Sequence, residues 1–247
     1  MQSEILEQYE QWHKDYNDNL ASQNQLKLMI WHKTALGHLL KNDIKGKRIL
    51  DVGCGNGDFA NYLSLNFNAD ITALDFSKES IKIANTRKTI FNANTSNFLV
   101  GDAQNLPFEE NSFDFVVSCE CLEHVPNPQK MIDQLFKVVK KDGFVILTTE
   151  NYSNAYAYYI LFLKIIGKKF DSGSSLQPIE HFFVYWKVKK KFILSGFREI
   201  KTFSKEYILL LLPGSSPKTF TIQDTSSKIL KFLLKPLGRR FTYVAKK

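Results

Sequence analysis

The residues best suited to chemistry surround a glycine-rich turn. Gly53, Gly55 and Gly57 alternate with other residues, and the carboxylates Asp51 and Asp58 flank them. Glycine permits positive φ angles and lets a ligand approach the backbone closely. A dinucleotide-binding turn has a glycine where Asp58 stands, and two carboxylates so near the turn would repel a pyrophosphate. The turn therefore predicts a nucleotide-like ligand that carries positive charge.

Two further acids follow at the ends of apolar runs. Asp75 ends the run at residues 71–74. It stands about 20 residues beyond the turn, at the spacing where an acid accepts hydrogen bonds from both ribose hydroxyls. Asp102 follows a predicted strand at residues 98–100. An acid at a strand end is usually only a turn residue, so its spacing is what makes Asp75 a candidate ribose ligand.

These features together resemble a known family. The acidic glycine turn, Asp75, the pair Asp102-Ala103 and the approach to a fourth strand at residues 106–118 resemble the class I S-adenosylmethionine (SAM) methyltransferases. The resemblance runs in order over about 100 residues. It implies SAM as the cofactor, whose sulfonium and ammonium groups suit an acidic turn. It implies that cofactor-binding residues are Asp51, Gly53, Cys54, Gly55, Asp75, Phe76, Asp102, Ala103 and Glu120.

The acceptor side is expected in segment 119–128, after the fourth strand. Open α/β sheets bind ligands above the carboxyl ends of their strands, so Glu120, Glu123 and His124 should meet the methyl acceptor. The spacing Glu-x-x-Glu-His followed by Val-Pro-Asn-Pro is similar to the ubiquinone-biosynthesis O-methyltransferases. That resemblance implies either a divalent metal on these three side chains, which we do not favour, or proton abstraction by His124. Alternatively, the motif only orients the loop.

His181 and Tyr152 are two further acid–base candidates. His181 follows residues 168–178, which resemble the loop that closes over substrate in small-molecule methyltransferases. Tyr152 follows the fifth strand, where it can hydrogen-bond an acceptor oxygen. A structural role is the simpler interpretation of either residue. Displacement at the sulfonium methyl needs an aligned lone pair and exclusion of water, so a base matters mainly for a hydroxyl acceptor.

The function expected from the resemblance is methyl transfer from SAM to an oxygen of a small metabolite. The alternatives are a small amine, or a lipid-linked or nucleic-acid substrate held by the basic C-terminal region. Enzymes that methylate nucleobase amines have a Pro-Pro-aromatic motif after the fourth strand, whereas this chain has Ser118-Cys119-Glu120-Cys121. Neither Cys119 nor Cys121 has the neighbouring proline of the cytosine C5 enzymes. A nucleic-acid partner is therefore not expected.

The elements that must position these residues are expected to form one doubly wound α/β unit. The resemblance implies a Rossmann-like sheet of seven strands, mostly parallel, with an antiparallel last strand at residues 241–246. Residues 1–44 are expected to be an N-terminal helical cover. Its aromatic residues Tyr9, Trp12 and Tyr16 suit a wall near the sulfonium by cation–π attraction, or they pack the helices on the sheet.

The SAM-binding domain is expected at residues 45–247, with substrate-covering insertions at about 151–182 and a helical one at 205–239. Residues 155–167 are apolar on all sides, which predicts either burial or contact with a greasy substrate or a lipid surface. We expect them to help form the acceptor pocket. Residues 186–203 predict a helix that ends at Gly196 and then a strand.

Composition agrees with one folded catalytic domain. The chain has 247 residues, of which 44% are hydrophobic, enough for one large core. Its three cysteines show no metal-binding or paired spacing, which indicates neither a disulfide framework nor a structural metal. The first residues lack the pattern of a signal peptide, and the longest apolar runs are too short to span a bilayer. We therefore expect a cytoplasmic location.

Positive charge is concentrated near the C-terminus. Residues 187–247 hold 15 Lys or Arg against 3 acids, within a chain of net charge +8. Residues 226–241 predict an amphipathic helix with Ile229, Phe232 and Leu233 on its apolar face. We expect that face to pack inward on the core. The alternatives are peripheral contact with an anionic membrane, an acidic substrate or RNA. The sequence gives no signal for an oligomeric state.

Overall fold

The computed structural model describes residues 7–11, 25–168, 178–212, 218–222 and 224–247. Residues 7–11 are helical. The other elements, in chain order, are α2 (Ile30–Leu39), β1 (Arg48–Val52), α3 (Asp58–Phe67), β2 (Asp70–Asp75), α4 (Lys78–Phe91), β3 (Ser96–Val100), β4 (Phe113–Cys119), η1 (Leu122–His124), α5 (Pro128–Val138), β5 (Val139–Glu150), α6 (Ala155–Ile165), α7 (Tyr185–Leu194), β6 (Ile200–Leu212), β7 (Lys218–Ile222), α8 (Lys228–Leu234), η2 (Lys235–Leu237) and β8 (Gly238–Lys246).

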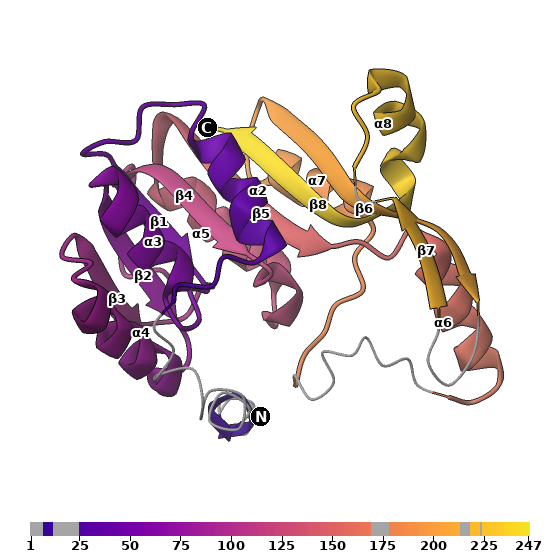
Figure 1. The fold of residues 1–247 in the computed structure, drawn as a ribbon, viewed down its shortest axis with the longest axis horizontal. Helices are drawn as coiled ribbons and strands as arrows, with labels where there is room; N and C mark the ends of the chain where they lie inside the picture. Colours follow the sequence, from indigo (N-terminus) through magenta and orange to yellow (C-terminus); the bar gives the residue numbers. More distant parts are fainter. Residues whose placement is uncertain (1–6, 12–24, 169–177, 213–217, 223) are drawn as a thin grey trace.

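The strands form one sheet in the order β3-β2-β1-β4-β5-β8-β6-β7 (Figure 1). Strands β1 to β5 pair in parallel, and β8 lies antiparallel between β5 and β6. The expected doubly wound, mostly parallel sheet with an antiparallel last strand is confirmed. The carboxyl ends of β1, β2, β4 and β5 therefore share one edge of the sheet.

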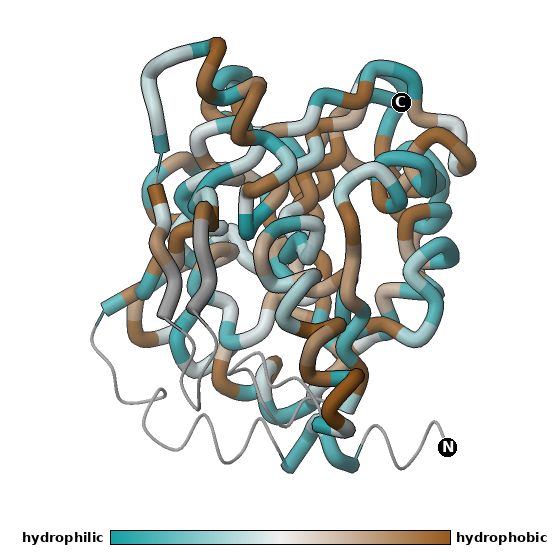
Figure 2. Tube along the Cα trace, turned by 90° about the vertical axis from the view of Figure 1, so that its right-hand side faces the viewer, coloured by the Kyte–Doolittle hydropathy of each residue, from teal (hydrophilic) through white to brown (hydrophobic). Residues whose placement is uncertain are grey.

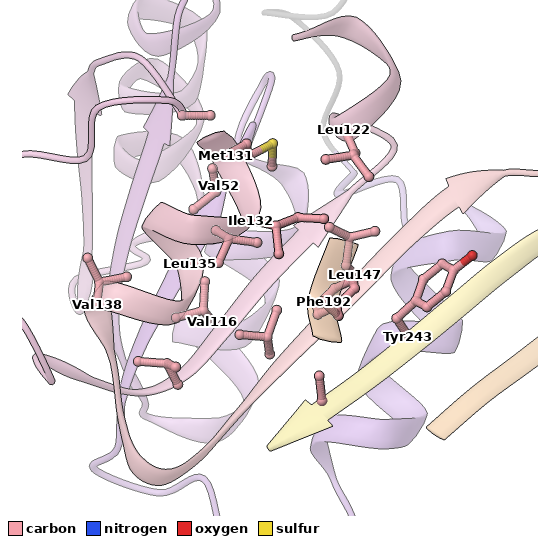
Figure 3. Close-up of a cluster of buried hydrophobic side chains, with 14 of the residues drawn as sticks. Val52, Val116, Leu122, Met131, Ile132, Leu135, Val138, Leu147, Phe192 and Tyr243 are labelled. Atoms are coloured by element: carbon pink, nitrogen blue, oxygen red, sulfur yellow. The ribbon is translucent and has the colours of Figure 1, made fainter. Parts of the chain in front are cut away.

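Alternate strand residues face two separate layers of helices. Leu50 and Val52 of β1 lie in the core with α5 and α7, whereas Ile49 lies in the core with α2, α3 and α4. Both faces of these strands are apolar because both are covered, as is typical of parallel sheets. Figure 3 shows part of the first core, with Val52, Val116, Leu122, Met131, Ile132, Leu135, Val138, Leu147, Phe192 and Tyr243.

The sheet has eight strands, one more than the seven expected. β6 runs on as far as Leu212, and β7 returns beside it as an antiparallel edge strand. The expected insertion at 205–239 is therefore a β-hairpin first and a helix only from Lys228 to Leu234. The physical reason is that Tyr207 and Ile208 are buried, and Phe220 and the threonines of β7 favour extended pairing.

Two apolar helices are more exposed than the sequence indicated. No residue of α8 is buried, so the prediction that its apolar face packs on the core is wrong. In α6 only Leu163 is buried, which contradicts the predicted burial of residues 155–167. Helix α6 lies against β6, whereas α8 projects away from the sheet and contacts mainly η2 (Figure 1). None of the described helices is long and apolar enough to cross a bilayer.

The helical cover expected at residues 1–44 is interrupted. Residues 25–29 are not helical, and α2 packs on the sheet through Ala35 and Leu39. The reason is that the apolar side of α2 packs in the same buried cluster as Ile49 of β1 and Ile146 of β5. Trp12 and Tyr16 lie outside the described residues. Tyr9 is described, and it lies at the candidate site.

Candidate active site

The turn after β1 leaves room above one glycine. Gly53 and Gly55 have φ angles of 75° and 51°, which favour glycine. A Cβ at Gly53 would lie 2.5 Å from Cys121 Sγ, so packing against the loop after β4 requires glycine there. A Cβ at Gly55 would meet no atom of the described residues within 4 Å. The space over Gly55 is therefore open to a ligand.

Asp51 presents an unsatisfied acceptor at this turn. The side chain is buried, and Oδ2 has no hydrogen-bond partner within the described part of the chain. Burial, and then the charge of Asp75, raise the pKa of Asp51 to about 7. A buried carboxylate oxygen without a partner costs free energy. A cationic group such as an ammonium would satisfy it, so the turn fits the charge of SAM.

Asp75 joins the glycine turn to the start of α4. Its Oδ2 accepts a hydrogen bond from Gly55 N at 2.8 Å, and its Oδ1 accepts one from Ser77 N at 3.0 Å. The Ser77 side chain caps α4 by accepting from Ser80 N, as its position in the sequence predicts. A carboxylate accepts about four hydrogen bonds. Asp75 therefore keeps capacity for the two hydroxyls of a ribose.

The loop after β3 lies beside Asp75, because Gly101 N donates to Asp75 O at 2.9 Å. Asp102 Oδ1 accepts from Gln104 N at 2.8 Å, and Gln104 Oε1 accepts from Asn127 N at 2.8 Å. These bonds tie the loop to the start of α5. Asp102 and the buried Ala103 are thus held at the same strand ends as the glycine turn, while their adenine-binding role stays a prediction.

Residues 7–11 bridge the cofactor side and the acceptor side. Tyr9 Oη donates to His124 O at 3.1 Å, and the Tyr9 ring lies edge-on to Phe76 at 6.3 Å between centroids. Burial raises the pKa of Tyr9 above its usual value, so its phenol is a donor. The carboxylate of Glu10 accepts from Ser77 Oγ at 2.9 Å, which docks the segment on the start of α4.

Glu120, just after β4, belongs to an ion cluster centred on Arg240. The φ of 50° at Glu120 turns the chain sharply after the strand. Arg240 of β8 donates to Glu120 at 3.0 Å, to Glu150 at 3.1 Å and to Glu206 at 2.7 Å. The guanidinium of Arg240 also lies 4.6 Å from the ring centroid of Trp31. Burial raises the pKa of Glu120, although the charge of Arg240 opposes this shift.

Glu123 is buried beside this cluster. Its Oε2 accepts from Thr149 Oγ1 at 2.9 Å, and its backbone carbonyl accepts from His181 N at 2.8 Å. Burial, and then the charge of Glu120, raise the pKa of Glu123 well above its usual value. A neutral Glu123 carboxyl at the acceptor side is the form that burial favours.

His124 and His181 both bond to backbone carbonyls. His124 Nδ1 lies 2.9 Å from Ile179 O, and His181 Nε2 lies 3.0 Å from Val125 O. A carbonyl only accepts, so each of these nitrogens carries the hydrogen and the other nitrogen of each ring is the acceptor. Burial lowers the pKa of His124, although the carbonyl of Ile179 opposes this shift. The structure thus brings the two histidines together beside η1.

Tyr152 lies between two carboxylates. Its Oη is 2.9 Å from Glu150 Oε2 and 3.1 Å from Glu180 Oε1. Burial, and then the charges of Glu150 and Glu180, raise the pKa of Tyr152 far above its usual value. Tyr152 is therefore a hydrogen-bond donor and not a base in this arrangement.

The predicted site residues converge at one edge of the sheet, but a metal centre does not form in the part of the chain that is described. There, no group of three or more His, Cys, Asp or Glu side chains is placed to hold a metal ion. Side chains that sequence reasoning missed are Arg240, Glu150 and Thr149. Arg240 is 120 residues from Glu120, so no local spacing connects them.

The fold and the acidic, open glycine turn define a class of protein, the Rossmann-like enzymes that bind a nucleoside-containing cofactor at their strand ends. A family model described as a methyltransferase domain matches residues 50–147. A demethylmenaquinone methyltransferase of Oceanobacillus iheyensis is 32% identical over 185 residues, which cover 69% of this chain and 77% of that protein. The chain belongs to the class I SAM-dependent methyltransferases, and SAM is its cofactor.

Other relatives match a smaller part or differ more in sequence. A ubiquinone biosynthesis O-methyltransferase of Photobacterium profundum is 37% identical over 113 residues, which cover 46% of this chain. The chain spans about half, 47%, of the length of that relative. A solved structure from Thermotoga maritima is a SAM-dependent methyltransferase described as a possible histamine N-methyltransferase. Its alignment with this chain covers 99% of each chain, with a TM-score of 0.62 and 18% sequence identity. This last likeness shows the fold.

Proposed function

We propose that the protein transfers a methyl group from SAM to an oxygen of a small molecule, and that His124 accepts the proton of that oxygen. The carrying observation is the hydrogen bond between His124 Nδ1 and Ile179 O at 2.9 Å. It places the hydrogen on Nδ1 and leaves Nε2 as the acceptor. Because burial lowers the pKa of His124, the ring is neutral at physiological pH and able to take a proton.

The cofactor half of the proposal assigns one part of SAM to each strand end. When bound, SAM supplies a methyl group on a positively charged sulfur. Asp51 holds the ammonium group, and the backbone at Gly53 and Gly55 receives the methionine portion. Asp75 binds the ribose. Asp102 accepts a hydrogen bond from the adenine amino group, and Ala103 N donates to the ring. What supports these roles is the orphaned Oδ2 of Asp51 and the open space above Gly55.

An oxygen acceptor is favoured because it is the acceptor that needs a base. A neutral amine already has a lone pair, whereas a hydroxyl becomes a good nucleophile only as it loses its proton. A neutral histidine next to Glu123, whose pKa burial raises, suits the second case. The O-methyltransferase relative supports the same choice. Because the Thermotoga maritima protein is described as a possible histamine N-methyltransferase, methylation of an amine is the alternative outcome of the assay.

The experiment is methyl transfer from radiolabelled SAM to a small panel of probes. 1-Octanol and 4-methylcatechol offer a hydroxyl oxygen, and histamine offers an amine. The proposal predicts a labelled ether, identified by mass spectrometry of the product. Methylation of histamine with both oxygen probes unmodified would overturn it.

His124→Gln tests the proposed base. The expected loss in kcat is about 100-fold or more, because proton removal is lost while the loop is kept. The affinity for S-adenosylhomocysteine should stay unchanged in calorimetry. The wild-type rate should fall as pH drops through the lowered pKa of His124, and this acidic limb should vanish in the variant.

The matched comparison is His181→Gln, which should keep the acidic limb of the pH profile. Full activity of His124→Gln would assign His124 to structure. Loss of the limb in His181→Gln alone would move the role of base to His181.

A further inference from the structure

Helix α8 carries large apolar side chains on the outside of the molecule. Ile229 and Phe232 are 73% and 77% exposed, and Leu230 and Leu233 are also exposed. Single exposed apolar residues are normal on a protein surface, but four on one short helix mark an interaction site. In Figure 1, α8 projects from the sheet above the start of β8.

Positive charge accompanies these apolar side chains. Lys228 is exposed on α8, and Lys231 is half exposed with Nζ 3.3 Å from Asp224. Lys235 follows the helix, and burial, and then the charge of Lys189 on α7, lower the pKa of Lys235. Asp224 is the sole acid between residues 224 and 235. The surface therefore pairs apolar side chains with cations, which is the pattern of a helix that lies in a lipid interface.

The helix is held at the acceptor side of the sheet. Asn151, just after β5, donates through Nδ2 to Pro236 O at 3.2 Å and to Gly238 O at 2.7 Å. Ser153 Oγ donates to Pro236 O at 3.0 Å, and Lys235 Nζ donates to Thr202 Oγ1. Because Tyr152 lies between these two anchors, the C-terminal end of α8 is close to the end of β5.

A second exposed apolar helix lies on the same side of the molecule. Tyr158, Leu161 and Ile165 of α6 are exposed. Figure 2 shows this side, with the apolar residues of α6 below the β6–β7 hairpin and those of α8 above it. The two helices flank the end of the sheet.

We propose that α8 docks the protein on an anionic lipid bilayer. Ile229, Phe232 and Leu233 enter the boundary of headgroups and acyl chains, and Lys228 and Lys231 meet lipid phosphates. RNA does not explain the apolar side chains. A second copy of the chain is disfavoured because a stable interface buries about 800 Å² on each partner, more than a seven-residue helix offers.

One consequence rests on the proposed function. With α8 on the bilayer, the end of β5 beside Tyr152 is held near the lipid, which favours a methyl acceptor dissolved in the membrane. Docking itself does not depend on the identity of the acceptor.

The test is co-sedimentation of the full chain with vesicles, without SAM or an acceptor. Vesicles of phosphatidylcholine mixed with phosphatidylglycerol are compared with phosphatidylcholine alone. Wild type should partition more strongly to the anionic vesicles. The double variant Ile229→Ser/Phe232→Ser should lose about tenfold or more in partition coefficient. Lys228→Gln should lose roughly fivefold on anionic vesicles alone.

The matched control is Leu65→Ser/Ile90→Ser, which removes exposed apolar side chains from α3 and α4 and should bind like wild type. Calorimetry with S-adenosylhomocysteine should give the same affinity for all variants, which shows that they are folded. Wild type that stays in the supernatant, or a double variant that binds like wild type, would overturn docking. Docking would also be overturned if neither wild type nor the double variant binds vesicles, and wild type instead forms a dimer or an RNA complex that the double variant does not form. The vesicle result does not depend on whether any acceptor of the panel is methylated, and the panel result does not depend on vesicle binding.

Discussion

Asp51 shows how a single residue can be shaped for a ligand. Its carboxylate is buried, lacks a partner for Oδ2 among the described residues, and has a pKa of about 7 without ligand. An ammonium group favours the ionised form. Asp51 must therefore lose a proton to bind SAM at acidic pH, whereas it is already ionised at alkaline pH.

The affinity for S-adenosylhomocysteine should consequently fall as pH drops below about 7, approaching tenfold for each pH unit. Asp51→Asn should bind weakly, and its affinity should not change between about pH 6 and 8 because no proton is exchanged at this position. Calorimetry at several pH values measures both. Asp70→Asn, at the opposite end of β2, should keep the wild-type pH dependence. A pH-independent wild type would remove Asp51 from the ammonium site.

Asp75→Ala tests the ribose ligand. The variant should lose well over tenfold in affinity for S-adenosylhomocysteine, since a carboxylate that binds hydroxyls contributes about 1.5–3 kcal/mol per charged hydrogen bond. Its far-UV circular dichroism should match wild type. Asp70→Ala on the same strand is the control, because Asp70 is exposed and far from the turn. Unchanged affinity in Asp75→Ala would contradict the assignment.

Residues whose roles depend on local spacing were predictable, and those that depend on distant partners were not. The glycine turn, Asp75 and the Ser77 cap each follow from a few neighbouring positions. Arg240 has no such signal, because its three carboxylate partners lie on β4, β5 and β6 or just after them. Its side chain meets them only after the sheet has formed.

At the scale of elements, β8 joins the strand ends through Arg240. Removing one partner from such a cluster leaves partly buried carboxylates without a counter-charge. Arg240→Met should therefore lower the free energy of unfolding by about 3–5 kcal/mol. The loss should be larger at pH 8 than at pH 5, because burial raises the pKa of Glu120 and low pH therefore protonates this carboxylate.

Urea unfolding at the two pH values measures this loss. Arg48→Met is the control. Its Nε lies 4.0 Å from Asp70 with both side chains about half exposed, so the loss should be about 0–1 kcal/mol. Equal losses in the two variants would show that the cluster adds no more than a surface ion pair.

Element type was easier to predict than element environment. The helix that stops near Gly196 and the last strand are confirmed, because periodicity and glycine mark them locally. The β6–β7 hairpin was missed, since an apolar run of leucines fits a strand or a helix equally well. The amphipathic pattern of α8 was recognised, but a pattern does not say whether the core or a membrane covers its apolar face.

At the scale of the whole molecule, one sheet connects both halves of the chain and separates two cores. Strand β8 inserts between β5 and β6, so the C-terminal strand completes the sheet begun at β1. We expect residues 45–247 to unfold as one unit for this reason. Leu135 of α5 lies in the core that α7 and β8 share.

Leu135→Ala should lower the free energy of unfolding by about 2–5 kcal/mol, through lost burial and a residual cavity. Transitions followed by far-UV circular dichroism and by tryptophan fluorescence should shift together. Leu65→Ala, on the exposed side of α3, should cost much less. Two separated transitions would contradict a single cooperative unit.

The central claim is that the acidic turn after β1 holds the cofactor, and a crystal structure with S-adenosylhomocysteine tests it most directly. The aminoacyl end should lie against Asp51 and Gly55, with the ribose at Asp75 and the adenine at Asp102 and Ala103. Ligand density elsewhere, with the space above Gly55 filled by protein side chains, would contradict the account.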